Sequence, residues 1–479
     1  MLGLLRVGTD RVRGRLVGLA LVAIVAVQAV VFAQSVPAAA SSDYDEGAYL
    51  ASVDALRHGQ ALGTDVFASQ PPGWYRLLEL LSFVTGRSVD GWRVAILVVA
   101  LAGTLAAFAL VRLLAGDWAG LTAAAALGLG PNYAEFAARI VADIPALTFT
   151  LGALGLAIAA FTGRRPGLAV AAGAVLTCAI AIKLTAVTVV PTILALVWIR
   201  RARLREIAGV AGGAAAMALV IVLPYVGALG SLWDGVVTVH REIGNLSTIP
   251  NTGANRYQLR QAYIHHGTTV FFWLELAGAF AFLLLLWRRQ WSLWPLWLWT
   301  AFAAIAVEQT RPLQPNHYTL LSVAIALPVG ASIGAVLART RPGLLQLSLG
   351  FGVVVLLAIG YVRAGQRVAD QPRDNGAAVD WAVKNLRSHS RPDQLVATDR
   401  PIVAYLADRR LPGELVDTSF LRFEVGSLTP STVLSTIDRD NVTAVFSGRE
   451  FRKHPDLVTG LNRRFPRKRQ FEDVTLYLR

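Results

Sequence analysis

Apolar side chains dominate long runs of this chain, and polar residues are concentrated between those runs. A helix that crosses a bilayer needs roughly 20 predominantly apolar residues. Eleven runs have or approach that length and predict membrane-spanning helices, near residues 16–35, 93–113, 118–133, 143–161, 167–182, 184–199, 206–224, 269–287, 291–307, 317–337 and 343–361. The runs at 118–133, 167–182 and 184–199 are short and also fit half-spans. The pattern therefore predicts a mainly α polytopic membrane helix bundle.

Arginine clusters at alternate boundaries of these runs give the predicted orientation. Short cytoplasmic loops of membrane proteins carry an excess of Lys and Arg. The clusters are Arg6, Arg11, Arg13 and Arg15, then Arg112, then Arg164 and Arg165, then Arg200, Arg201, Arg203 and Arg205, then Arg288 and Arg289, then Arg339 and Arg341. With eleven spans, all of them fall on one side. We therefore expect a cytoplasmic N-terminus and an extracytoplasmic C-terminal segment in the cell membrane.

The first loop, residues 36–92, has an amphipathic pattern. Apolar residues at Tyr49, Val53 and Leu56 have the spacing of one helical face, and Trp74 to Leu81 repeats it. Such helices suit a membrane interface. By the orientation above, this loop is extracytoplasmic and belongs to a membrane domain that comprises residues 1–361.

The polar tail, residues 362–479, predicts a separate small α/β domain. Helices are indicated after Gly376 and from Thr429-Pro430. Short strands are indicated at 395–397, 442–446 and 474–478. Alternation of helices and strands is typical of α/β folds. By the span count, this domain is extracytoplasmic.

Composition narrows the function classes. The chain is 54% hydrophobic and only 16% charged, with a mean hydropathy of +0.51. Its net charge of +14 could suggest nucleic-acid binding, but much of the excess lies in the short loops that set membrane orientation. We therefore expect no nucleic-acid partner. Cys178 is the single cysteine, so no disulfide framework exists. No phosphate-binding loop, dinucleotide fingerprint, zinc signature or nucleophile elbow is present.

Three carboxylates in four residues, Asp43, Asp45 and Glu46, directly follow the first span. Neighbouring carboxylates repel one another, which favours a proton acceptor or a cation site. The alternative is structural, because acids also cap helix N-termini, here of a helix beginning near Gly47. The cluster therefore has three interpretations: a proton acceptor, a site for a divalent metal ion, or a helix cap.

These features resemble the GT-C glycosyltransferase superfamily, in particular its protein O-mannosyltransferase and lipid A aminoarabinose transferase branch. The resemblance lies in Asp45-Glu46 after the first span and in the later Gln70-Pro-Pro-Gly-Trp-Tyr75 segment. It implies an inverting glycosyltransferase with a polyprenyl-phosphate-sugar donor and an extracytoplasmic glycan, lipid or protein acceptor. Asp45 would be the catalytic base with Glu46 as support, and the extra acid Asp43 is the alternative candidate for the base. Substrate-binding candidates in this loop are Asp43, Tyr49, Pro72 and Tyr75.

A second candidate acid is Asp143, at the outer start of the fourth predicted span. An ionisable group at a membrane boundary is costly unless it is paired or solvated. Asp143 could act with Asp45 by orienting the acceptor or holding a divalent ion. The alternative is a local ion pair with Arg139, four residues earlier on the same helix face.

The donor phosphate requires cations or backbone donors. Lys183 lies between two short apolar segments, where it could bind phosphate or extend toward the interface. Further candidates for the substrate site are Arg139, Arg256, Arg311, His317 and Tyr318. His317-Tyr318 could equally be an interfacial anchor.

Two other classes remain as alternatives. A transporter or a flippase for lipid-linked sugars would place ionisable residues near the bilayer midplane and often has inverted repeats. Here the acids gather at one face and no repeat is visible. A non-catalytic assembly or sensor protein would use the tail as its binding module. The sequence favours the enzyme.

Overall fold

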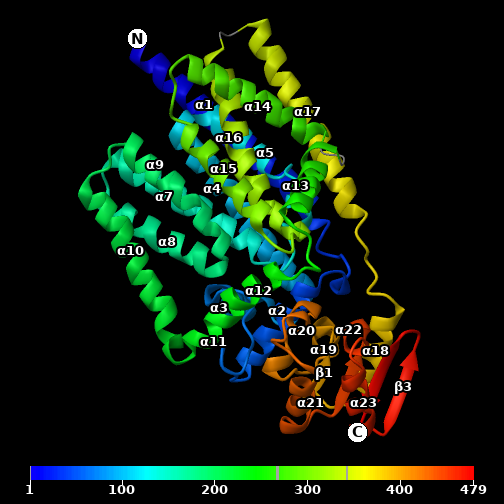
Figure 1. Cartoon of the computed structure of the whole chain (residues 1–479). Coiled ribbons are helices and arrows are strands. Elements are labelled where there is room, and N and C mark those ends of the chain that lie inside the picture. Colours follow the sequence, from blue (N-terminus) through cyan, green and yellow to red (C-terminus); the bar gives the residue numbers. More distant parts are fainter. Residues whose placement is uncertain (1, 266–268, 341–342) are drawn as a thin grey trace. The chain divides into compact units, whose positions relative to one another are not determined.

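Each of the eleven predicted spans contains a helix. The structure is a computed structural model that describes residues 2–265, 269–340 and 343–479 (Figure 1). In that part of the chain, seven helices are long and apolar enough to cross a membrane, and the apolar helices Pro166–Ile182 and Leu184–Ile199 are shorter. The count of eleven spans therefore stays a prediction.

The chain divides into two compact units. The first combines the chain up to Val36 with Arg93–Val220 and Asn251–Asp370. Its helices are α1 (Leu2–Ala33), α4 (Val89–Ala115), α5 (Asp117–Leu127), α6 (Tyr133–Phe136), α7 (Asp143–Gly163), α8 (Pro166–Ile182), α9 (Val190–Ile199), α10 (Leu204–Val222), α13 (Thr252–Arg260), α14 (Thr269–Trp287), α15 (Trp294–Gln309), α16 (Tyr318–Arg339) and α17 (Leu344–Ala369). The second unit combines Pro37–Trp92, Ile221–Pro250 and Gln371–Arg479. The first loop is thus grouped with the tail, whereas the sequence analysis assigned it to the membrane domain.

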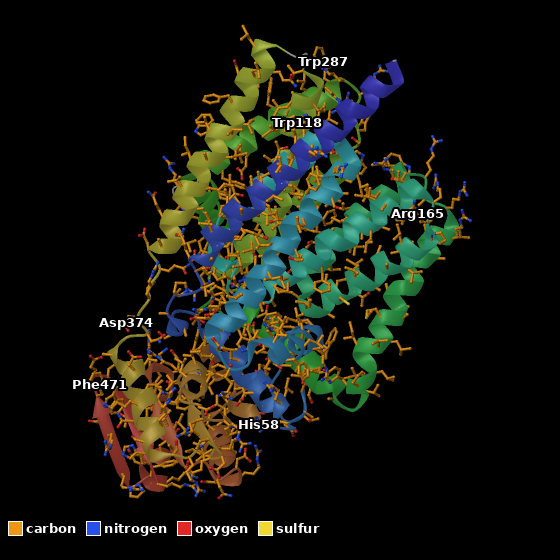
Figure 2. All side chains as sticks on the ribbon, turned by 180° about the vertical axis from the view of Figure 1, so that it is seen from behind. His58, Trp118, Arg165, Trp287, Asp374 and Phe471 are labelled. Carbon is orange, nitrogen blue, oxygen red and sulfur yellow. The ribbon has the colours of Figure 1, made fainter. Side chains whose placement is uncertain are left out.

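The predicted basic loops gather at one end of the first unit. Trp118, Arg165 and Trp287 lie toward the same end of its helices (Figure 2). Arg164 donates hydrogen bonds to the backbone carbonyls of Arg201 (2.8 Å) and Arg200 (3.3 Å), and so joins two of these loops. This arrangement agrees with the pattern of arginines along the sequence.

Glycine lets α16 approach α5 closely. A Cβ atom on Gly330 would lie 2.5 Å from the Cα of Ala123, and one on Gly334 would lie 2.5 Å from the carbonyl oxygen of Trp118. Small residues four apart allow such contacts between membrane helices. The backbones of the two helices therefore pack directly against each other.

We expect Gly330→Leu to destabilise this contact by about 1–3 kcal/mol, the usual cost of overpacking. Gly212→Leu is the matched control, because a Cβ atom at Gly212 meets nothing within 4 Å. Thermal unfolding of the purified protein should show a lower Tm for Gly330→Leu than for the control. Equal Tm values would contradict the close packing.

A buried polar network links four helices of the first unit. The side-chain amide of Gln28 on α1 donates to the Ala124 carbonyl of α5 (2.8 Å) and to the Tyr361 hydroxyl of α17 (2.6 Å). The Thr104 hydroxyl of α4 donates to the Gln28 side-chain oxygen (2.5 Å). In an apolar bundle these groups must be satisfied internally. The network therefore fixes how α1, α4, α5 and α17 meet.

The second unit contains the predicted α/β domain. Its four-stranded sheet has the order β1-β2-β4-β3, with β1 and β2 parallel and the other pairs antiparallel. The strands are β1 (Val396–Thr398), β2 (Ala444–Ser447), β3 (Arg467–Phe471) and β4 (Val474–Leu478). Packed around the sheet are α18 (Ala377–His389), α19 (Pro401–Leu406), α20 (Phe420–Glu424), α21 (Pro430–Arg439), α22 (Arg449–Arg452) and α23 (Pro455–Arg464). Val433, Ile437 and Leu461 pack in its core.

The segments Pro37–Trp92 and Ile221–Pro250 add further helices to this unit. These are α2 (Tyr44–Arg57), α3 (Pro72–Thr85), α11 (Leu229–Trp233) and α12 (Val239–Asn245). The two predicted amphipathic helices are therefore α2 and α3. Trp74, Tyr75 and Leu78 form the buried side of α3, while Leu80, Phe83 and Val84 are exposed on another side.

Candidate functional site

The acidic cluster forms the first turn of α2. Asp43 is the N-cap residue, and its Oδ1 accepts a hydrogen bond from the backbone nitrogen of Asp45 (2.9 Å). Asp45 is half-buried and Glu46 is fully buried, at 0% exposure. The expected start near Gly47 is wrong by three residues, because Asp43 caps the helix and lets it begin at Tyr44. Asp43 therefore has a structural role as the helix cap.

The C-terminal domain holds α2 in place. A Cβ atom on Gly47 would lie 2.6 Å from the backbone nitrogen of Ile402, so α2 packs against α19 without a side chain between them. The Tyr44 hydroxyl accepts from the backbone nitrogen of Thr418 (2.7 Å) and donates to Oδ1 of Asp417 (3.1 Å). Burial raises the pKa of Tyr44 well above its usual value, so the phenol stays a donor. Tyr44, the residue directly before Asp45, is therefore anchored on the α/β domain of the tail.

We expect Tyr44→Phe to destabilise the second unit by about 1–3 kcal/mol, because the Thr418 nitrogen and the Asp417 carboxylate both lose a partner. Urea unfolding, followed by a spectroscopic probe in the tail domain, measures the change. Tyr257→Phe, at an exposed tyrosine of α13, is the matched control. Equal midpoints for the two variants would show that the Tyr44 hydroxyl does not hold α2.

The aromatic candidates lie behind the acidic turn as a buried cluster. Tyr49 packs edge-on against Trp74 and Tyr75, with ring centroids 5.4 and 6.5 Å away, a favourable arrangement of aromatic rings. The Tyr75 hydroxyl accepts from the backbone nitrogen of Ser69 (3.0 Å), and burial raises the pKa of Tyr75 to about 12. Pro72 is the first residue of α3. In this structure Tyr49 and Tyr75 are therefore core residues that support α2 and α3.

The second acid is part of a buried ion pair in the first unit. Asp143 is the first residue of α7 and is 3% exposed; Lys183 follows α8 and is 7% exposed. The Lys183 ammonium donates to both carboxylate oxygens of Asp143, at 2.7 and 2.6 Å. The side-chain amide of Asn316 donates to Oδ2 of Asp143 (3.1 Å). The ends of α7 and α8 and the turn before α16 thus converge on one carboxylate.

The sequence analysis gave each residue of this pair a structural alternative. For Asp143 the sequence suggested Arg139 as a local partner, and the structure pairs its carboxylate with Lys183, forty residues further along. For Lys183 it suggested extension toward the interface, but the ammonium is buried in the pair. A buried pair is stable only if its charges stay together. A phosphate that reached Lys183 would therefore share it with Asp143.

The turn before α16 is fastened by local bonds. His317 Nδ1 accepts from the backbone nitrogen of Gln314 (3.2 Å), and the Tyr318 carbonyl accepts from the Tyr263 hydroxyl (2.9 Å). The Asn132 side chain donates to the Pro315 carbonyl (3.0 Å). These bonds position Asn316, a site residue that the sequence analysis missed because a single uncharged amide carries no distinctive signal.

The remaining basic candidates differ in their surroundings. Arg256 is exposed and pairs with Glu308, with Nε 2.5 Å from Oε1. Arg311 is half-buried, and Arg139, in the segment that connects α6 to α7, is buried. Among the described residues, no group of three His, Cys, Asp or Glu side chains could hold a metal ion.

The candidates thus fall into two groups, one in each unit. The group in the second unit comprises Asp43, Asp45, Glu46, Tyr49, Pro72 and Tyr75. The group in the first unit comprises Arg139, Asp143, Lys183, Arg256, Arg311, His317 and Tyr318. Each group contains a carboxylate near a helix N-terminus.

Comparisons with known proteins give the fold a context. Residues 69–227 match the family model of dolichyl-phosphate-mannose-protein mannosyltransferase, about a third of the chain. No curated protein matches the sequence.

Solved structures are similar over most of the chain. ArnT from Cupriavidus metallidurans bound to undecaprenyl phosphate has a TM-score of 0.69 and 14% identity, and the match covers 95% of this chain and 97% of that one. The oligosaccharyltransferase AglB from Archaeoglobus fulgidus, in complex with an inhibitory peptide and a dolichol-phosphate, has a TM-score of 0.59 and 13% identity, over 89% of this chain and 69% of that one. The predicted fold is confirmed, and the chain is a multi-pass membrane protein.

Proposed function

We propose that this chain is a membrane glycosyltransferase of the GT-C type, which moves a sugar from a polyprenyl-phosphate carrier to an extracytoplasmic acceptor. The observation that carries the proposal is the fold shared over nearly the whole chain with a structure bound to undecaprenyl phosphate. The mannosyltransferase family model over residues 69–227 supports the same chemistry. The placement of Asp45 in the first turn of α2 supplies a base for it.

In the proposed reaction, Asp45 takes the proton of the acceptor hydroxyl. That oxygen then attacks the anomeric carbon, and the bond from this carbon to the carrier phosphate breaks. Because phosphate is already a good leaving group, no protonating acid is required, whereas the hydroxyl is a poor nucleophile until a base removes its proton. Attack from the face opposite the phosphate inverts the anomeric configuration. Glu46 lies buried beside Asp45 and supports the turn.

The second group of residues would serve the donor and the acceptor. Lys183 and Asp143 form a fixed pair whose carboxylate could orient the acceptor while the ammonium faces the phosphate charge. Further cationic or hydrogen-bonding groups for the phosphate are Arg139, Arg256, Arg311, His317 and Tyr318.

The proposed orientation places the N-terminus in the cytoplasm and the tail domain outside. It is supported by the basic loops that gather at one end of the first unit (Figure 2). Asp45 follows the first span and would then face the extracytoplasmic side, where a carrier-linked sugar and its acceptor can meet. The transporter alternative receives no support from the structural matches, which are to ArnT and an oligosaccharyltransferase.

Mass spectrometry of a deletion strain tests the proposed function. We expect one saccharide to disappear from an envelope glycan, lipid or protein, and the corresponding polyprenyl-phosphate sugar to accumulate. Restoring the gene should reverse both changes. Loss of the saccharide with the lipid-linked sugar trapped on the cytoplasmic face would instead indicate a flippase, and unchanged envelope saccharides would contradict the proposed function.

A further inference from the structure

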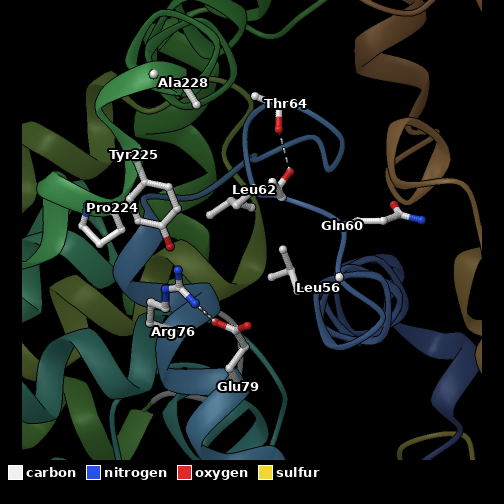
Figure 3. A pocket seen from close by; sticks show the side chains of 12 residues that line it. Leu56, Gln60, Leu62, Thr64, Arg76, Glu79, Pro224, Tyr225 and Ala228 are labelled. Carbon is white, nitrogen blue, oxygen red and sulfur yellow. Dashed lines mark hydrogen bonds and ion pairs between the residues drawn. The ribbon is translucent and has the colours of Figure 1, made fainter.

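A cavity of about 400 Å³ lies within the second unit, apart from the acidic turn (Figure 3). Its walls come from the loop after α2, from α3, and from the segment Leu223–Ala228 that precedes α11. Its volume falls within the range of small-molecule sites, near the lower end. None of the residues proposed for catalysis lines it.

One wall of the cavity is polar but has no net charge. Arg76 and Glu79 lie one turn apart on α3, with Nη1 2.7 Å from Oε2, and the guanidinium lies 5.2 Å from the centre of the Tyr225 ring. Figure 3 shows Arg76 between Tyr225 and Glu79. Because Glu79 neutralises Arg76, the wall has no excess cation for a phosphate or carboxylate. It does offer charged acceptors and donors together, which suits hydroxyl groups that both donate and accept.

The remaining lining is mixed, and it includes the polar side chains of Gln60 and Thr64. Leu56, Leu62, Pro224 and Ala228 contribute side chains to the cavity (Figure 3). A sugar ring has hydroxyl groups at its edge and C–H groups on its faces. Polar and apolar walls around one cavity therefore fit a neutral saccharide better than an ion or a plain hydrocarbon.

The loop that forms part of the wall is fixed in advance. The backbone nitrogen of Ala61 donates to Oδ2 of Asp65 (2.8 Å), and that of Gly63 donates to the Val66 carbonyl (2.9 Å). Gly63 has φ +87°, and a Cβ atom there would meet the Leu232 side chain at 2.9 Å. A preformed wall lowers the entropy that a ligand loses on binding.

Large apolar side chains are exposed on the elements that form the cavity. On α3 these side chains are Leu80 and Phe83, and Phe83 is 81% exposed. In the segment Leu223–Ala228 and the following α11 they are Val226, Leu229 and Trp233, and Trp233 is 63% exposed. Clusters of exposed apolar residues mark contact with lipid or other apolar groups. A ligand in the cavity would therefore have a place for an alkyl chain beside its polar head.

We propose that this cavity binds the neutral sugar headgroup of a glycolipid, with Arg76 and Glu79 contacting its hydroxyls, and that a glycolipid is the acceptor class. The acceptor assignment rests on the proposed function, whereas binding itself does not.

Photo-crosslinking tests the binding site. The protein in phosphatidylcholine nanodiscs is irradiated with octyl β-glucoside that carries a diazirine, and the labelled peptides are identified by mass spectrometry. We expect labels on residues 56–64 or 224–228, competed by unlabelled octyl glucoside. Octyl phosphocholine should compete poorly, because it lacks the hydroxyls. Glucose alone should compete at least about tenfold more weakly, since it lacks the alkyl chain.

Glu79→Gln should reduce labelling about tenfold, because it removes a charged acceptor. Glu424→Gln, an exposed position outside the cavity, is the matched control and should label normally. Equal competition by octyl phosphocholine, or full labelling of Glu79→Gln, would overturn the site. Equal competition by glucose would overturn the glycolipid assignment.

Crosslinking requires neither donor nor turnover, so the two proposals can fail separately. Asp45→Asn should label normally even where transfer is lost. Specific labelling of a protein without any transferase activity would leave the cavity as a glycolipid site and remove the acceptor role. Transfer by the wild type without labelling would remove the cavity and leave the transferase.

Discussion

Asp45→Asn is expected to lower the rate of sugar transfer by about 100- to 10,000-fold, the usual contribution of a general base. Asparagine matches aspartate in size but cannot accept the proton of the acceptor hydroxyl. The measurement is single-turnover transfer by the purified protein in lipid vesicles, with its polyprenyl-phosphate-sugar donor and acceptor once mass spectrometry has identified them. The affinity for the donor should change little, so the loss should fall on the chemical step.

Asp43→Asn is the matched control for this experiment. Asp43 caps α2 through its side-chain oxygen, and asparagine caps a helix about as well as aspartate. We therefore expect Asp43→Asn to retain most of the transfer rate. A near-normal rate for Asp45→Asn would remove Asp45 from the mechanism, and a large loss only in Asp43→Asn would assign the base to Asp43.

Lys183→Met is expected to destabilise the protein by about 3–5 kcal/mol, because it leaves the Asp143 carboxylate buried with the Asn316 amide but without the lysine charge. An uncompensated buried charge is costly. Denaturant unfolding of the purified protein measures this change. Arg256→Met is the matched control, because its ion pair with Glu308 is exposed, and it should cost about 1 kcal/mol or less.

The double variant Asp143→Asn with Lys183→Met separates stability from activity. Removing both charges should recover most of the lost stability, because two neutral groups of similar volume replace the pair. Transfer should remain low if the pair serves the substrates. Full activity in the double variant would show that Asp143 and Lys183 only hold the helix ends together, and additive losses of stability would contradict the pair itself.

The features predicted well from sequence depend on local chemistry. Apolar length predicted the long apolar helices of the first unit, and capping predicted α21, whose Thr429 hydroxyl accepts from the backbone nitrogen of Thr432 (3.1 Å). Strand β4 has the predicted bounds, because its residues Val474–Leu478 are buried and β-forming. Strand β3 was missed because the Arg467-Lys468-Arg469 segment is highly charged. Such charge is usual for an exposed edge strand, where it discourages pairing with other chains.

The sequence named candidate residues for the site, but it predicted only partly which of them contact one another. Asp143 and Lys183 were both named, but their pairing depends on how α7 and α8 pack, and no local spacing encodes it. The anchoring of Tyr44 by Asp417 joins residues 373 positions apart and is likewise invisible in sequence. Tyr75 belongs to the Gln70–Tyr75 segment and Tyr49 to the amphipathic pattern. Neither pattern distinguishes an aromatic side chain that contacts substrate from one that packs behind the site.

Cysteine accessibility in intact cells tests most directly whether the acidic turn faces outward. In a Cys178→Ser background, Thr64→Cys labels the exposed loop after α2, and Arg203→Cys labels an arginine-rich loop at the predicted cytoplasmic end. We predict that a membrane-impermeant maleimide modifies Thr64→Cys in intact cells and Arg203→Cys only after permeabilisation. The reverse pattern would place Asp45 in the cytosol and contradict extracytoplasmic transfer.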